Sequence, residues 1–132
     1  MVNNLIDGGY VFVESQGRSG ETARITGPTF LVPSGHNATC LRFWSHMTGV
    51  DVGTLRVLTV QENMTHSLHP EVIFEHRGNQ GTIWLNSVVE IAVPASQYLK
   101  VIFEIVIGSG DAGCIAIDDI ELLSGSCPQG YY

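Results

Sequence analysis

The apolar residues of this chain come in short runs rich in β-branched and aromatic side chains, and Gly, Pro, Asn and Ser separate the runs. This punctuation is typical of strands joined by turns, and no apolar pattern of helical period extends over a useful length. The chain is therefore predicted to be all-β, with strands over 10–14, 23–27, 40–47, 54–60, 71–76, 82–85, 88–93, 99–107 and 114–123.

The number and spacing of these runs indicate a sandwich or a barrel. Parallel strands need crossover connections of about a dozen residues or more, usually helical, and no such segments separate the runs. The sheets should therefore be antiparallel. In the run 99–107, one face carries only apolar side chains and should point into the core, which predicts a central strand. These side chains are Leu99, Val101, Phe103, Ile105 and Ile107.

The last long apolar run changes its phase midway. Ile115 and Ile117 have one parity, whereas Ile120 and Leu122 have the other. Because side chains alternate between the two faces of a strand, all four reach one core only if an extra residue resets the register. We therefore predict a β-bulge at Asp118–Asp119.

Length and charge narrow the classes of protein. The 132 residues are enough for one domain, 1–132, and one core. Thirteen acidic residues against six basic ones give a net charge of −7, which repels phosphate backbones and anionic lipids, so nucleic acid is not an expected partner. No apolar stretch approaches the roughly 20 residues that cross a bilayer, and direct membrane insertion by this chain is not expected.

The signals for a cellular compartment conflict. The N-terminus lacks the basic flank, apolar stretch and cleavage site of a secretory signal, which favours the cytosol. The sequons Asn37-Ala38-Thr39 and Asn63-Met64-Thr65 instead predict N-glycosylation and an extracellular location. The conflict disappears if the chain is a fragment of a longer secreted or membrane-anchored protein.

Eight blocks of the sequence are distinctive in their order: GYVFVE (9–14), ARI (23–25), CLRFWSHM (40–47), GTLRV (53–57), GNQGTIW (78–84), VIFE (101–104), GCIAIDDI (113–120) and GSC (125–127). In this order they resemble the MAM domain, the adhesion-type module named after meprin, the A5 antigen (neuropilin) and receptor tyrosine phosphatase mu. The resemblance covers 9–127. The family's first segment, with two further cysteines, an acidic residue and a Trp-containing stretch, is missing, so the domain is interpreted as truncated at its N-terminus.

The resemblance implies an antiparallel jelly-roll β-sandwich with a concanavalin-like two-sheet architecture. It also implies an extracellular protein-interaction module for cell adhesion or oligomerisation within a larger secreted or membrane-anchored protein, with a protein partner that can be a second copy. Missing first strands would expose a sheet edge and favour self-association. The alternative is a carbohydrate-binding jelly roll that uses Trp44 and Trp84 as stacking platforms. Both tryptophans lie in blocks that the family shares, so we expect them to pack in the core or between the sheets.

The three cysteines cannot all pair within the chain. Three buried thiols in a cytosolic protein remain an alternative, whereas metal binding is disfavoured because no C-x-x-C or nearby Cys/His set occurs. The resemblance implies a disulfide between Cys40 and Cys127, which would stabilise the fold by about 4 to 5 kcal/mol in the chain-entropy model. Cys114 is then left unpaired, as a small buried hydrophobe or, alternatively, as one half of an intermolecular disulfide.

Catalytic motifs are absent from the sequence, so no catalytic residue and no enzyme activity are expected. Asp118 and Asp119 are neighbours in a strand and should point to opposite faces, which excludes a glycosidase-type pair. No cofactor is required. Because some similar domains carry a structural cation, the resemblance implies Asp118 as a ligand of a calcium or sodium ion.

The histidines have no spacing that points to a metal site. His66 and His69 fall in a polar loop without a third ligand and should be surface residues. His46 and His76 alternate with aromatic neighbours along strands, where a half-buried imidazole is the usual outcome.

Overall fold

The computed structural model describes residues 11–14, 20–27, 29–33, 35–62, 70–93, 97–108 and 113–129. Within these residues the chain forms strands and no helix, as predicted. The described residues therefore contain no helix that could cross a membrane. The strands are β1 (Val11–Glu14), β2 (Thr22–Thr26), β3 (Phe30–Leu31), β4 (Ala38–Thr48), β5 (Thr54–Glu62), β6 (Glu71–Arg77), β7 (Leu85–Ala92), β8 (Tyr98–Val106) and β9 (Cys114–Ser124).

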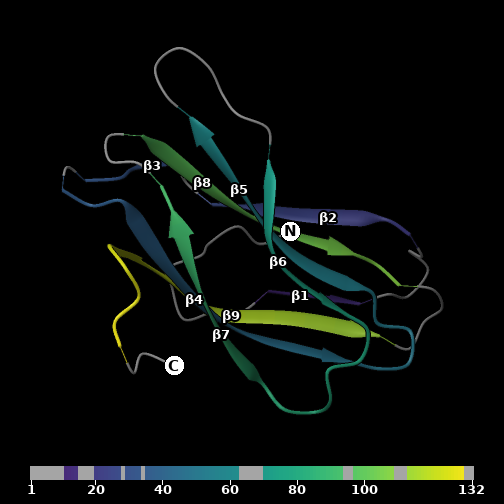
Figure 1. Ribbon diagram of the computed structural model, residues 1–132. Coiled ribbons are helices and arrows are strands. Elements are labelled where there is room, and N and C mark those ends of the chain that lie inside the picture. The colour runs from purple at the N-terminus through teal and green to yellow at the C-terminus, as the bar shows by residue number, and fades with distance from the viewer. Residues whose placement is uncertain are drawn as a thin grey trace.

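The strands form two antiparallel sheets stacked face to face in a jelly-roll sandwich (Figure 1). The first sheet has the order β1-β9-β4-β7, and the second has the order β2-β8-β5-β6 with β3 also paired to β8. Neighbouring strands are mostly far apart in the sequence. This topology confirms the predicted all-β class and the antiparallel pairing.

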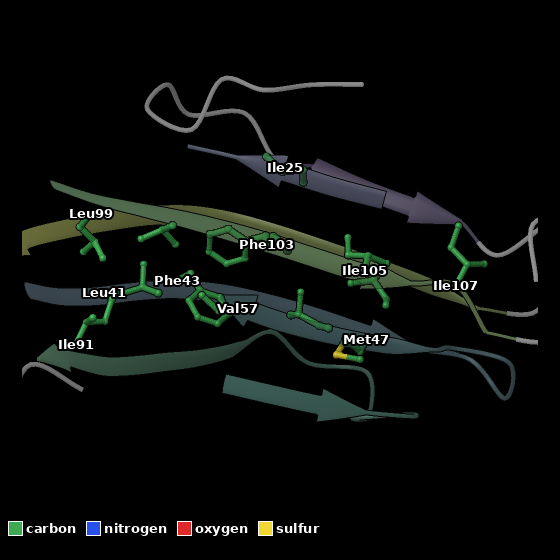
Figure 2. Close-up of a cluster of buried hydrophobic side chains, with 14 of the residues drawn as sticks. Ile25, Leu41, Phe43, Met47, Val57, Ile91, Leu99, Phe103, Ile105 and Ile107 are labelled. Carbon is green, nitrogen blue, oxygen red and sulfur yellow. The ribbon is translucent and has the colours of Figure 1, made fainter. Parts of the chain in front are cut away.

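The core lies between the two sheets, where the inner face of β8 meets the inner face of β4 (Figure 2). All five side chains predicted to point inward from 99–107 are buried. The ring of Phe103 meets the ring of Phe43 edge to face, with centroids 5.2 Å apart, and Phe43 meets Phe74 in the same way at 5.1 Å. Such pairs add about 0.5 to 1.5 kcal/mol to the burial of the rings themselves.

The predicted β-bulge is present in β9. On β4, Arg42 pairs with Glu121 and Trp44 pairs with Asp118, so three steps on β9 face two steps on β4. Asp119 is the extra residue and has φ 50°, the one positive φ of a residue other than glycine in the described chain. Asp tolerates this left-handed conformation better than most residues, which explains why an aspartate can occupy the bulge.

The bulge places both halves of β9 against the core. Ile115 and Ile117 are buried before it, and Ile120 packs against the same core after it. Leu122 has the register position opposite Leu41, on the inner face, although it retains 37% exposure near the end of the strand. One inserted residue therefore turns two opposite apolar phases into one buried face.

The segment between β6 and β7 differs from the prediction. A strand was predicted over 82–85, but these residues lead out of a turn and β7 begins only at Leu85. Gly78 and Gly81 have φ of 73° and 96°, and the backbone N–H of Gln80 donates to the Met47 carbonyl at 2.8 Å. The turn thus reaches across to the end of β4 and leaves no partner strand for 82–84. The two-residue strand β3 was missed because it is too short to show a period.

A disulfide joins Cys40 on β4 to Cys127, which lies just beyond β9, with the two Cα atoms 4.8 Å apart. The backbone N–H of Cys127 also donates to the Glu90 carboxylate on β7 at 2.9 Å. The segment after β9 is thereby fixed to the outer face of the first sheet.

Cys114 lies outside this disulfide and is half-buried, less enclosed than the small buried hydrophobe expected from the sequence.

Reduction of the Cys40–Cys127 disulfide is expected to lower the free energy of unfolding by about 4 to 5 kcal/mol, because the bond closes a long loop in the unfolded chain. Urea unfolding with and without a phosphine reductant measures the loss. The Cys114→Ala variant is the control and should lose the same amount on reduction. An unchanged midpoint, or an effect that disappears in Cys114→Ala, would contradict this assignment.

Candidate functional site

Two tryptophans and a histidine gather on the outer face of the first sheet. Along β4, Phe43 and Ser45 point into the sandwich and are buried, so Trp44 and His46 point outward and are half-buried. Trp84, from the turn before β7, lies beside His46 with ring centroids 5.4 Å apart and the planes inclined by 47°. This arrangement corrects the expectation that both tryptophans pack in the core or between the sheets.

Polar groups border these rings. Asn86 on β7 and Asp118 on β9 are the register partners of Trp44 on its two sides. The Asn86 side-chain oxygen is buried and accepts no hydrogen bond within the described residues. We call Trp44, His46, Trp84 and Asn86 the aromatic patch. Trp84 is 40% exposed, so its ring offers a partner both apolar surface and a π-face.

Asp118, the predicted cation ligand, sits at the bulge. Its Oδ1 accepts the backbone N–H of Asp119 at 2.8 Å, which holds the carboxylate against the bend in β9. In the described parts of the chain, no group of three or more His, Cys, Asp or Glu side chains is placed to hold a metal ion. A cation at Asp118 therefore stays a prediction from the resemblance alone.

The remaining predicted sites divide between described and undescribed parts of the chain. Asn37 is exposed in the segment before β4, whereas Asn63, His66 and His69 lie outside the described residues. His76 is half-buried on β6, with its ring centroid 4.5 Å from that of Phe74.

A row of charged side chains crosses the outer face of the second sheet. Cross-strand register aligns Arg24 on β2, Glu104 on β8, Arg56 on β5 and Glu75 on β6 in one row. Arg77 joins the end of this row, and we call the five residues the charge ladder. Opposite charges alternate across the four strands, and Arg77 adds a further positive charge beside Glu75 on β6 itself.

Guanidinium groups hold both carboxylates of the charge ladder. Glu104 accepts from Arg24 Nε at 2.7 Å and from Arg56 Nη1 at 3.1 Å, and its side chain is only 9% exposed. Glu75 accepts from Arg56 Nε at 2.5 Å and from Arg77 Nε at 2.9 Å. Arg56 therefore bridges the two carboxylates and occupies the centre of the ladder.

These contacts shift the pKa values of three side chains in the charge ladder. Burial alone would raise the pKa of Glu104, but the hydrogen bonds from Arg24 and Arg56 outweigh it and the pKa is lowered. The hydrogen bonds from Arg56 and then Arg77 lower the pKa of Glu75, and the same contacts with Glu75 and Glu104 raise the pKa of Arg56. Both carboxylates are thus held in their charged form.

The sequence alone did not indicate the charge ladder. The alternation along a strand can place a charged residue on the outer face of that strand, but the row exists only once four strands are aligned. Those strands come from distant parts of the chain, in the spatial order β2-β8-β5-β6. A run of charged residues at outward positions of several strands is the one signal that could have suggested it.

The chain is a jelly-roll sandwich. It carries the aromatic patch on the outer face of the first sheet and the charge ladder on the outer face of the second. The family model of the MAM domain, meprin/A5/mu, matches residues 3–128, and the chain belongs to this family. The resemblance inferred from the sequence blocks is confirmed.

Two curated relatives illustrate the match. Neuropilin-1 of Xenopus laevis is 36% identical over 124 residues, which cover 93% of this chain and 13% of the relative. The MAM domain-containing glycosylphosphatidylinositol anchor protein 1 of Mus musculus is 36% identical over 131 residues, which cover 97% of this chain and 13% of the relative. The chain thus spans about an eighth of the length of each of these relatives.

Solved structures with a similar fold are carbohydrate-binding modules. The module titled Family 16 Carbohydrate Binding Module-2 has a TM-score of 0.58 at 13% identity and covers 85% of this chain and 74% of its own. A structure titled CBM4 structure and function has a TM-score of 0.51 at 17% identity, over 87% of this chain and 82% of its own. At this identity the likeness shows the shared fold.

Neutralising Glu104 tests the charge ladder. Glu104→Gln is expected to lower the free energy of unfolding at pH 7 by about 2 kcal/mol, because two guanidinium groups lose an almost buried carboxylate partner. Glu75→Gln, at the more exposed end, should shift the urea midpoint less.

The acid dependence of this effect has a defined sign. A carboxyl whose pKa is lowered by folding contributes stability above its ordinary pKa of 4.5, and this contribution is lost as the pH falls through the lower folded value. The stability difference between the wild type and Glu104→Gln should therefore shrink from pH 5 towards pH 3. A difference that stays constant over this range in urea titrations would contradict the role assigned to Glu104.

Proposed function

We propose that this chain is a non-enzymatic, extracellular protein-interaction module of a larger secreted or membrane-anchored protein, and that it acts in cell adhesion or oligomerisation. The observation that carries the proposal is the aromatic patch, in which Trp84 is 40% exposed and lies against His46 on the outer face of the first sheet. Tryptophan is among the residues most enriched at the energetic centres of protein interfaces.

Membership of the MAM family supports the extracellular part of the proposal. One relative carries a glycosylphosphatidylinositol anchor in its name, which belongs to proteins held at the outer cell surface. The disulfide between Cys40 and Cys127 agrees with an oxidising compartment. The net charge of −7 argues against nucleic acid and anionic lipid surfaces as partners.

The chemistry of the aromatic patch favours a protein partner with its own apolar or cationic groups. Trp44 and Trp84 supply flat apolar surface, and a tryptophan face attracts Lys or Arg of a partner. The Asp118 carboxylate, at the register position beside Trp44, supplies an acceptor at the border of the rings. An interface of this kind has an apolar centre and a polar rim.

A second copy of the chain is one candidate partner. In the described structure the edge strands are β1 and β7 in the first sheet and β2 and β6 in the second, and β7 is the edge that adjoins the aromatic patch. The charged side chains Glu71, Glu75 and Arg77 on β6 oppose strand addition there, whereas β7 is mostly apolar. We therefore propose β7 as the edge for homophilic pairing, next to the aromatic patch.

Truncation of Trp84 is expected to weaken partner binding at least about 10-fold, because it removes the exposed ring from the centre of the proposed interface. The protein is displayed as a multimer on beads and tested for bead aggregation and for binding to a panel of cell-surface ectodomains. Tyr98→Ala is a matched control, because Tyr98 on β8 is 41% exposed and lies on the other sheet.

The outcomes separate the possibilities. Loss of binding in Trp84→Ala with retained binding in Tyr98→Ala, and unchanged thermal midpoints in both, is the expected result. Equal binding by the two variants and the wild type would sink the proposed interface. Absence of aggregation and of binding to every ectodomain would count against the adhesion function itself.

A carbohydrate-binding function is the second candidate. It is favoured by the exposed indole of Trp84 and by the polar Asn86 and Asp118 on the two sides of Trp44, since sugar rings pack on aromatic faces and hydrogen-bond to nearby polar groups. The solved structures with TM-scores above 0.5 carry names of carbohydrate-binding modules. Glycan-array binding that disappears in Trp84→Ala but persists in Tyr98→Ala would favour this candidate over the protein partner.

A further inference from the structure

The first sequon of the chain straddles a sharp change in environment. Asn37 lies just before β4 with its side chain exposed, and its backbone carbonyl accepts the N–H of Val93 at 3.0 Å. Two residues later, Thr39 is inside β4 with 0% exposure. The acceptor asparagine and the hydroxyl residue that defines the acceptor sequence therefore have opposite accessibility in the folded domain.

The Thr39 hydroxyl contributes no hydrogen bond to the fold. Its Oγ1 is buried and has no partner within the described residues, although the register places Thr39 between Ile91 on β7 and Ser124 on β9. A buried hydroxyl without a partner is unfavourable, whereas valine has nearly the same shape, favours strands and carries no polar atom. Packing alone would therefore favour valine at this position.

We propose that Asn37 carries an N-linked glycan that is attached before β4 pairs with β7 and β9, and that folding then closes this modification site by burying Thr39. The oligosaccharyltransferase must engage Thr39 while the segment is still extended and exposed. The hydroxyl at position 39 thus serves the modification of the nascent chain and not the stability of the finished domain.

The chemical step is a glycosyl transfer without oxidation or reduction. The donor is an oligosaccharide linked through C1 to a lipid pyrophosphate. A bond forms between Asn37 Nδ2 and C1 of the first sugar, the bond between C1 and the phosphate oxygen breaks, and the amide nitrogen loses one proton. The lipid pyrophosphate leaves with the electron pair of the broken bond.

The position of Asn37 keeps the glycan away from the proposed interface. Asn37 lies next to the end of β9, because the carbonyl of the following residue, Ala38, accepts the N–H of Gly125 at 2.8 Å. Trp44, the member of the aromatic patch nearest to Asn37 along the chain, lies seven residues further on, which corresponds to roughly 23 Å at about 3.3 Å per residue. The glycan would shield one end of the sandwich and leave the patch open.

The test uses the full chain secreted from cultured animal cells, with glycopeptide mass spectrometry reading Asn37 separately from Asn63. Asn37 is expected to be occupied in the wild type and in Thr39→Ser, and empty in Thr39→Val and Asn37→Gln. Of the two variants without a glycan on Asn37, Thr39→Val should unfold at the higher urea concentration, because it lacks the unpartnered hydroxyl. An occupied Asn37 in Thr39→Val, or an empty one in the secreted wild type, overturns the proposal.

A second arm tests the order of events. Unglycosylated chain is offered to solubilised oligosaccharyltransferase and a lipid-linked oligosaccharide, once folded and oxidised and once reduced, alkylated and diluted from urea. The unfolded chain should acquire a glycan on Asn37 at least 10-fold faster than the folded chain. Equal rates would overturn the claim that folding closes the site.

The proposal rests on the extracellular location in the proposed function but not on the binding partner. An empty Asn37 in a secreted protein that still binds through Trp84 would overturn the glycan and leave the interaction function intact. An occupied Asn37 in a protein that binds no ectodomain and no glycan would do the reverse.

Discussion

The β-bulge at Asp118–Asp119 is the constraint on which the first sheet depends. β9 lies between β1 and β4, and its two halves carry apolar residues of opposite parity. The extra residue Asp119 reverses the phase, so that Ile117 before the bulge and Ile120 after it face the same core. Without it, one half of the strand would turn its apolar side chains to solvent and point its carboxylates inward, which is unfavourable on both counts.

The bulge also organises the outer face of the first sheet. It places Asp118 beside Trp44 and Glu121 beside Arg42, where the latter two form an ion pair. The disulfide from Cys40 then fixes the segment that follows β9 to the same face. One end of β4 is thus covalently closed and adjoins Asn37, while the part of β4 towards its other end carries Trp44 and His46 of the aromatic patch. The proposed modification at Asn37 and the proposed binding at the aromatic patch are therefore separated along the chain.

Local sequence information predicted features that depend on one strand at a time. The alternation in 99–107 identified the inner face of β8, and the parity change identified the bulge, because both follow from the two-residue period. The charge ladder depends on the pairing of four strands, of which only β5 and β6 are consecutive in the sequence, and no local pattern encodes this register. It was found only in the assembled sheet.

The errors of prediction have local physical causes. Trp44 was expected inside because tryptophan is usually well buried, yet Phe43 occupies the inward position and the alternation sends Trp44 outward. Trp84 was assigned to a strand that does not form, because Gly78 and Gly81 hold a turn at that point. The aromatic patch was therefore missed as a surface, although both of its tryptophans had been singled out.

The cross-strand register around the bulge can be measured directly by NMR, from nuclear Overhauser effects between backbone protons of β4 and β9. The structure predicts contacts of Arg42 with Glu121 and of Trp44 with Asp118, with Asp119 left out of the pairing. Contacts of Trp44 with Asp119 in an unbroken ladder from Glu121 would contradict the bulge, and with it the account of how β9 closes the core.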